Sequence, residues 1–125
     1  MYSRVNEADV DEMEVPVEGN DALVTPVGYV MDVEELRPNV WRYEAGQTTS
    51  LHRHTDQEEL FYVIEGSLTL EIGEDPDDLE TVSLEEGDVL AVSHDPWRRL
   101  VATEDAKVLA VGAPNVPDDH EIHGE

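Results

Sequence analysis

Short runs of apolar residues alternate with polar turn residues along most of this chain, and the clearest alternation lies at residues 67–72. There Leu68, Leu70 and Ile72 are separated by polar residues, which is the period of a strand with one buried face. Similar runs recur at short, even intervals, and no long amphipathic helical stretch interrupts them. The pattern predicts an all-β sandwich or barrel, with strands at residues 28–33, 40–44, 49–54, 59–65, 67–72, 79–84, 89–92, 98–102 and 107–111.

The segments between and outside these runs are polar and predict turns and loosely attached ends. The sequence "IEGS" predicts a hairpin turn with Gly66 at its tip, and residues 73–78 predict a solvated hairpin loop. A single helical turn is expected near residues 6–10, and the C-terminal residues are expected to be extended or frayed. The chain therefore divides into an acidic lead-in, one β domain and an acidic tail: residues 1–21, 22–114 and 115–125.

Strand alternation also selects the side chains of the predicted interior. Trp41 and Tyr43 share one face of their strand and line either a cavity or a dimer surface. A concave apolar pocket with a few polar groups is the usual form of a small-molecule site, although plain core packing explains the same residues. The predicted interior residues are Leu51, Phe61, Val63, Leu68, Leu70, Val89, Ala91 and Leu100.

Acidic residues far outnumber basic ones in this chain. Its 125 residues include 31 Asp and Glu but only 7 Lys and Arg, which gives a formal net charge of −24. Such a surface repels nucleic acids and anionic membranes. The acids are spread through the apolar runs, which favours adaptation to high intracellular salt, where the screening length falls to about 3 Å. An acidic mimic of nucleic acid is the alternative, but it leaves the histidines described below unexplained.

Absences in the composition limit the chemistry and the expected compartment. The chain has no cysteine, which excludes disulfides, thiolate ligands and a cysteine nucleophile. No apolar run approaches the roughly 20 residues of a membrane span, and the acidic N-terminus lacks the apolar core of a secretory signal. We therefore expect a cytoplasmic protein.

The candidate chemistry lies in the sequence "LHRHTDQEELFYVIEG". Alternation places His52 and His54 on one face of a strand, and Glu59 faces the same way if the following strand pairs with it as a hairpin. Two imidazoles and one carboxylate are a sufficient ligand set for a divalent first-row metal. Alone, two such histidines are equally explained as exposed polar residues or as core histidines bonded to backbone carbonyls.

The whole string resembles the first motif of the cupin family, in which fixed spacings separate a glycine, two histidines, a glutamate and a second glycine. Gly46, His52, His54, Glu59 and Gly66 meet every position and spacing of that motif. The resemblance implies a double-stranded β-helix, or jelly-roll barrel, often a homodimer. It also implies a metal ion held inside the barrel by His52, His54 and Glu59.

The second cupin motif is only partly present. It begins at Gly87, but Ser93, Asp95 and Arg98 stand where the family has proline, glycine and the histidine that supplies a fourth metal ligand. His94 is a candidate replacement, although a loop histidine is the simpler interpretation.

Arg98 cannot bind a metal, because a guanidinium stays protonated. Three arrangements are open. Arg98 binds an anionic substrate group beside a three-ligand metal, pairs with Glu59 in a metal-free barrel, or points outward.

Two hypotheses of function follow. In the first, a cytoplasmic and dimeric cupin binds a divalent ion (Fe, Mn, Zn, Ni or Cu) and acts on or binds a small organic molecule by oxygenase- or isomerase-type chemistry. Arg98 then orients an anionic group, and Tyr62 and His94 are candidates for proton transfer. In the second, the chain is a non-catalytic ligand-binding barrel or a dimeric interaction module. His120 and His123 lie in a segment that is expected to be a flexible tail rather than a metal site.

Overall fold

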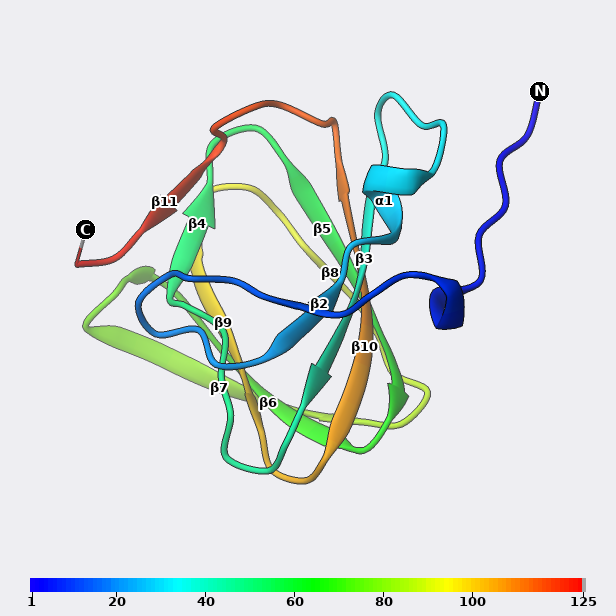
Figure 1. Cartoon of the computed structure of the whole chain (residues 1–125). Coiled ribbons are helices and arrows are strands. Elements are labelled where there is room, and N and C mark those ends of the chain that lie inside the picture. The colour runs from blue at the N-terminus through cyan, green and yellow to red at the C-terminus, as the bar shows by residue number, and fades with distance from the viewer. Residues whose placement is uncertain (125) are drawn as a thin grey trace.

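Two antiparallel sheets packed face to face make up the computed structural model, which describes residues 1–124 (Figure 1). The first sheet runs in the order β1 (Met13–Glu14), β2 (Leu23–Thr25), β3 (Arg37–Tyr43), β10 (Ala106–Ala113), β5 (Glu58–Glu65) and β8 (Val89–Val92). The second runs in the order β11 (His120–Ile122), β4 (His52–His54), β9 (Trp97–Ala102), β6 (Ser67–Asp75) and β7 (Asp78–Glu85). The predicted all-β jelly-roll architecture is confirmed.

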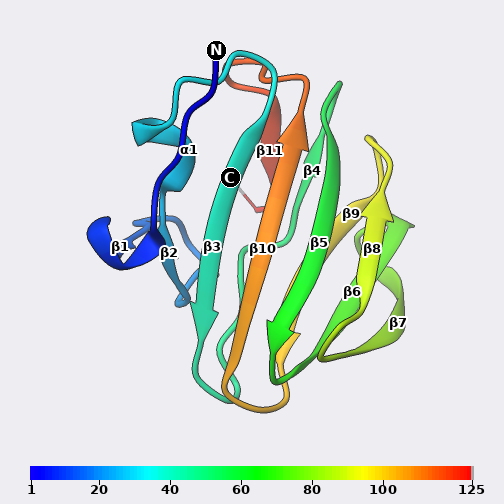
Figure 2. The ribbon, with the colours of Figure 1, turned by 90° about the vertical axis from the view of Figure 1, so that its right-hand side faces the viewer.

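The core lies between the two sheets, with the broad first sheet in front of the second in Figure 2. Residues of β10 alternate between buried and half-buried, as expected for strands with one face turned to the core. Five of the predicted interior residues are buried there: Phe61, Val63, Leu68, Leu70 and Leu100.

The prediction for β8 is wrong, because Val89 and Ala91 are exposed and the core instead receives Leu90 and Val92. Leu90 pairs with the buried Phe61 on β5, and residues directly opposite on paired strands share a face. The pattern "VLAV" is apolar at every position, so alternation alone could not fix which face turns inward.

The hairpin predicted at Gly66 is wrong, and the hairpin on which the placement of Glu59 was conditional does not form. Gly66 has φ +81° at a corner where the chain leaves β5 in one sheet and enters β6 in the other. A Cβ at this position would overlap the Asp105 carbonyl, so the corner requires glycine. Likewise β4 pairs with β9 and β11, whereas β5 pairs with β10 and β8, so β4 and β5 lie in different sheets.

A short helix, α1 (Val27–Val30), replaces the strand predicted at residues 28–33. Val27 is buried, and Gly28 lies so close to the backbone of Pro38 that an added Cβ would meet its carbonyl oxygen at 2.9 Å. The apolar run is therefore used to pack one helical turn against β3.

Segments near both ends of the chain contact the barrel, and near the N-terminus Glu7 pairs with Lys107 on β10. The expected N-terminal turn is the 3₁₀ helix η1 (Glu7–Asp9), where Asn6 Oδ1 accepts a hydrogen bond from the Ala8 amide. The C-terminal segment is extended but not frayed, because β11 pairs with β4 in the register His120 opposite His54 (Figure 1). Within residues 1–124, no helix has the length and apolar character needed to cross a bilayer.

Candidate metal centre

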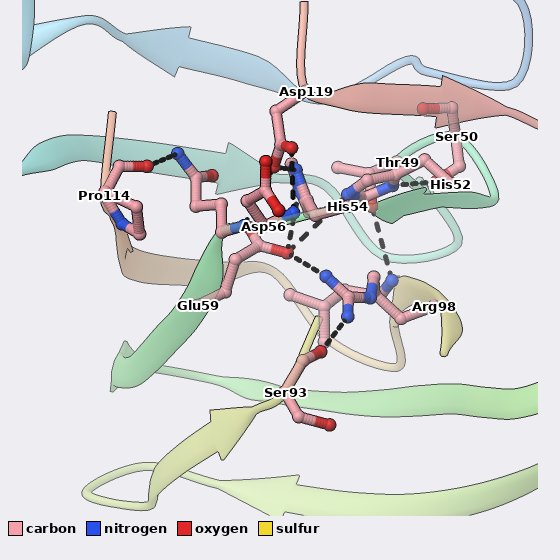
Figure 3. Close-up of polar contacts among 12 residues, drawn as sticks. Thr49, Ser50, His52, His54, Asp56, Glu59, Ser93, Arg98, Pro114 and Asp119 are labelled. Carbon is pink, nitrogen blue, oxygen red and sulfur yellow. Dashed lines mark hydrogen bonds and ion pairs between the residues drawn. The ribbon is translucent and has the colours of Figure 1, made fainter. Parts of the chain in front are cut away.

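Strands from opposite sheets bring the three predicted ligands together (Figure 3). His52 and His54 project from β4, and Glu59 projects toward them from β5. His54 Nε2 lies 3.2 Å and His52 Nε2 lies 3.7 Å from the same Glu59 oxygen, Oε1. One ligand atom from each of the three residues lies within 4.8 Å of the others, so His52, His54 and Glu59 can together hold a metal ion.

The contacts of Nδ1 in His52 and His54 determine that Nε2 of each ring faces the centre. His52 Nδ1 lies 2.8 Å from the carbonyl oxygen of Ser50, which can only accept, so we assign the proton to Nδ1. His54 Nδ1 lies 3.4 Å from Asp119 Oδ2 and makes no hydrogen bond among the described residues, but the nearby carboxylate favours a proton on Nδ1 here as well. Both Nε2 atoms therefore face one carboxylate oxygen, which is the orientation that metal-binding histidines take.

Asp119 is the residue of this site that sequence reasoning missed. Asp119 is 6% exposed, and its carboxylate accepts backbone N–H bonds from Asp56 and Gln57, both at 2.9 Å. Burial raises the pKa of Asp119, but these amides and His54 outweigh burial and hold the pKa below its usual value. No local signal separates Asp119 from the other tail acids, because only the pairing of β11 with β4 brings it to His54.

Arg98 points into the barrel, so the outward arrangement is wrong. It is 1% exposed, its Nη1 donates to Glu59 Oε1 at 2.8 Å, and its Nη2 donates to the Ser93 carbonyl. Its Nε–H is buried without a hydrogen-bond partner among the described residues. Burial lowers the pKa of Arg98, and Glu59 opposes that shift. Arg98 therefore adds one positive charge beside the carboxylate and leaves at most three protein ligands.

Glu59 is ionised in this setting. Burial alone raises the pKa of its carboxyl, but hydrogen bonds and charge from His52 and His54 outweigh burial and hold the pKa far below its usual value. Those hydrogen bonds use a proton on Nε2 of each ring, and a divalent ion would displace these protons, so that two imidazole nitrogens and one carboxylate oxygen would be directed at one point. The donor set therefore fits a divalent cation.

The structure does not bring Tyr62 or His94 to this centre. Tyr62 is 41% exposed on the outer face of β5, since its neighbours Phe61 and Val63 face the core. His94 is half exposed, and its Nδ1 lies 3.1 Å from the carboxylate of Asp95. His94 therefore does not take the place of the missing fourth ligand. At the C-terminus, the His123 ring packs edge-on against Trp97.

A cavity of about 310 Å³ opens beside the centre, within the range of small-molecule pockets. His52, His54 and Arg98 line its polar side. Its apolar side includes both predicted aromatic residues of β3 and part of the N-terminal segment: Trp41, Tyr43, Phe61, Leu100, Val15 and Pro16.

Comparisons with known proteins agree with this architecture. The family described as "Cupin domain" matches residues 39–112, more than half of the chain. The polyketide cyclase RemF from Streptomyces resistomycificus superposes with a TM-score of 0.82 at 19% identity, covering 100% of this chain and 87% of that one. A sugar phosphate isomerase of the cupin superfamily from Silicibacter pomeroyi gives a TM-score of 0.76 at 20% identity, covering 98% and 82%.

KdgF from Halomonas sp. gives a TM-score of 0.71 at 22% identity and covers 91% of this chain and 95% of its own. No curated protein matches the chain in sequence. At these identities the structural likeness establishes the fold alone, while the family match covers both the first-motif histidines and Glu59. The chain belongs to the cupin family.

Proposed function

We propose that this protein is a metal-dependent cupin that binds a small organic molecule beside a divalent ion held by His52, His54 and Glu59, and acts on it. One observation carries the proposal: the Nε2 atoms of two imidazoles converge on Glu59 Oε1 beside a cavity, with the Ser50 carbonyl and the Asp119 carboxylate near the far ring nitrogens.

The metal ligands, Arg98 and the apolar cavity wall have different roles in this proposal. A divalent ion with three protein ligands supplies open coordination positions, which suit Lewis-acid chemistry with Zn or Mn and oxygen chemistry with Fe. Arg98 holds Glu59 in place and keeps the pair balanced in charge, while the apolar cavity side excludes water from a bound molecule. Two structural neighbours are a cyclase and an isomerase, so this fold is compatible with enzymatic activity.

The test is metal analysis of the purified protein. We expect about one divalent ion per chain among Fe, Mn, Zn, Ni and Cu, removed by a chelator and regained on titration with the metal salt. Protein that neither retains an ion after purification nor binds one on titration would contradict the proposal.

A non-catalytic barrel is the second candidate, and one contact favours it. The 2.8 Å bond from Arg98 to Glu59 neutralises the carboxylate without any metal. That candidate predicts small-molecule binding that is unaffected by chelator and by metal titration, whereas the metal-dependent proposal predicts that chelation weakens it.

We further propose that two copies associate through the outer face of the first sheet. An outer apolar patch crosses β10, β5 and β8 there, with Tyr62 paired to both Leu109 and Val89; it comprises Leu60, Tyr62, Val89, Ala91, Leu109 and Val111. The three largest exposed members, Leu60, Tyr62 and Val89, are 42%, 41% and 63% exposed. Because a net charge of −24 makes copies repel elsewhere, an uncharged patch is the surface on which association costs least.

Light scattering at molar salt tests this association. We expect twice the chain mass of 14.0 kDa for the wild type and a single chain mass for Tyr62→Glu. Tyr29→Glu is the matched control, because Tyr29 is also exposed but lies on α1 outside the patch. A monomeric wild type, or a Tyr62→Glu protein that stays dimeric, contradicts the assignment.

The composition carries one more proposal, that the protein works in a cytoplasm of high salt. Acidic residues outnumber the cations that can pair with them by 31 to 7. The resulting repulsion is screened at molar salt, and we propose that compartment on the charge alone.

A further inference from the structure

The cavity reverses the charge balance of the chain. Acids outnumber cations by 31 to 7 overall, yet the cavity is lined by Arg37, Arg98 and Arg99 and, among acidic residues, by Glu14. Glu14 is exposed on the short edge strand β1. Arg98 pairs with Glu59 and Arg99 pairs with Glu71, so within residues 1–124 the charge of this lining that remains for an anion is that of Arg37.

Arg37 differs from the other two arginines of the cavity in having no acidic partner among the residues that the structure describes. Five of the seven cations form ion pairs with acids: Arg42 with Glu12, Arg53 with Glu121, Arg98 with Glu59, Arg99 with Glu71, and Lys107 with Glu7. Arg37 is half-buried, and within residues 1–124 no ion pair or hydrogen bond joins its side chain to another group. Its guanidinium donors are available to a ligand, and their fork geometry matches a carboxylate.

Strand register places Arg37 on the same wall as the metal centre. Arg37 lies opposite Gly112 on β10, and Gly112 lies opposite Glu59 on β5, so the three occupy one row across the sheet. Residues in such a row share a face, and two strand spacings separate the Arg37 and Glu59 backbones by roughly 10 Å. A molecule of a few bonded atoms can therefore reach from the Arg37 guanidinium to the centre.

Gln57 fills the middle of this row. Gly112 has no side chain, and the Gln57 carboxamide lies against it so closely that a Cβ at 112 would overlap Gln57 Oε1. Gln57 is 2% exposed and lines the cavity, and its Nε2 donates one hydrogen bond, to the Pro114 carbonyl at 3.2 Å. The amide carries two N–H groups, so one donor is left beside the path from Arg37 to Glu59.

We propose that the cavity takes a small organic acid whose carboxylate binds Arg37, with its apolar part beside Trp41 and Phe61 and its far end at the metal centre. Only the placement of the far end rests on the proposed metal function. A singly charged carboxylate is favoured over a phosphate, because one unpaired guanidinium balances one charge and much of the remaining cavity wall is apolar.

Matched probes test this assignment. Straight-chain carboxylates from propanoate to octanoate, and benzoate, are compared with their primary amides by calorimetric titration at fixed ionic strength, using metal-loaded and chelator-treated protein. We expect at least one acid to bind about tenfold more tightly than its amide, which is the size of a charge-assisted hydrogen-bond contribution near 1.4 kcal/mol. Arg37→Gln is expected to abolish that preference and to leave the metal stoichiometry unchanged.

Arg42→Gln is the control, because Arg42 lies on the same strand but is exposed and paired with Glu12. It is expected to keep the wild-type preference. The inference is overturned if no acid is preferred over its amide, or if the preference survives in Arg37→Gln. An acid preference in a protein that binds no metal contradicts the proposed function alone, and a metal-binding protein without the preference contradicts this inference alone.

Discussion

Replacement of Arg98 by methionine is expected to lower the free energy of unfolding of the metal-free protein by about 3–5 kcal/mol, the usual cost of removing one partner of a buried ion pair. Arg98 is 1% exposed and donates to Glu59 Oε1 at 2.8 Å. The methionine fills much of the same volume but leaves an ionised carboxylate without its cation. It also removes the donor that the Ser93 carbonyl uses.

Denaturant unfolding measures this effect, and the neighbouring residue supplies the control. Arg99 also forms an ion pair with a glutamate, Glu71, at 3.1 Å, but its side chain is 37% exposed. Arg99→Met is therefore expected to cost less than about 1 kcal/mol. Equal and small losses in both variants contradict the assignment of Arg98 and Glu59 as a buried pair. The double variant Arg98→Met with Glu59→Gln is expected to regain part of the free energy of unfolding lost in Arg98→Met, because Glu59→Gln removes the unpaired buried charge.

Replacement of His54 by alanine is expected to weaken metal binding by about 100-fold or more, since even partners that only orient a ligand contribute 10- to 100-fold. His54 Nε2 is the nearer of the two imidazole nitrogens to Glu59 Oε1, and its side chain is buried. Competition with a chromophoric chelator measures the affinity.

Two further variants are compared with His54→Ala, one expected to have a smaller effect and one expected to have none. Asp119→Asn keeps the shape of the side chain that orients His54 but removes its charge, so we expect a 10- to 100-fold loss. His94→Ala is the control, because His94 is half exposed and contacts only Asp95 among charged groups of the described chain; its affinity is expected to equal that of the wild type. An affinity that falls as much in His94→Ala as in His54→Ala contradicts the proposed ligand set.

Local spacing was enough to predict most strands and the three candidate ligands. His52 and His54 are two residues apart on one strand, so their shared face follows from the pleat whichever strand they pair with. The convergence with Glu59 was predicted for a wrong reason, because β4 and β5 are not a hairpin and meet across the barrel. Alternation held within β5, and this placed Glu59 inward in either arrangement.

Other features depend on contacts between distant segments. Asp119 reaches His54 only because β11 returns to the edge of β4, and the sequence of the tail reads as a polar end. The sequence leaves the orientation of Arg98 open, because either face of β9 can accept a long side chain, and the pairing of His52 with Arg98 decides it. In the same way, the row of Arg37, Gly112 and Glu59 follows from sheet order rather than from any local pattern.

Anomalous diffraction from crystals of the protein loaded with manganese or zinc tests whether His52, His54 and Glu59 hold a metal ion. We expect one peak per chain, about 2.0–2.2 Å from His52 Nε2, His54 Nε2 and a Glu59 oxygen. A map in which the only peaks lie elsewhere, such as on the acidic surface, while Arg98 remains bonded to Glu59 would contradict this expectation.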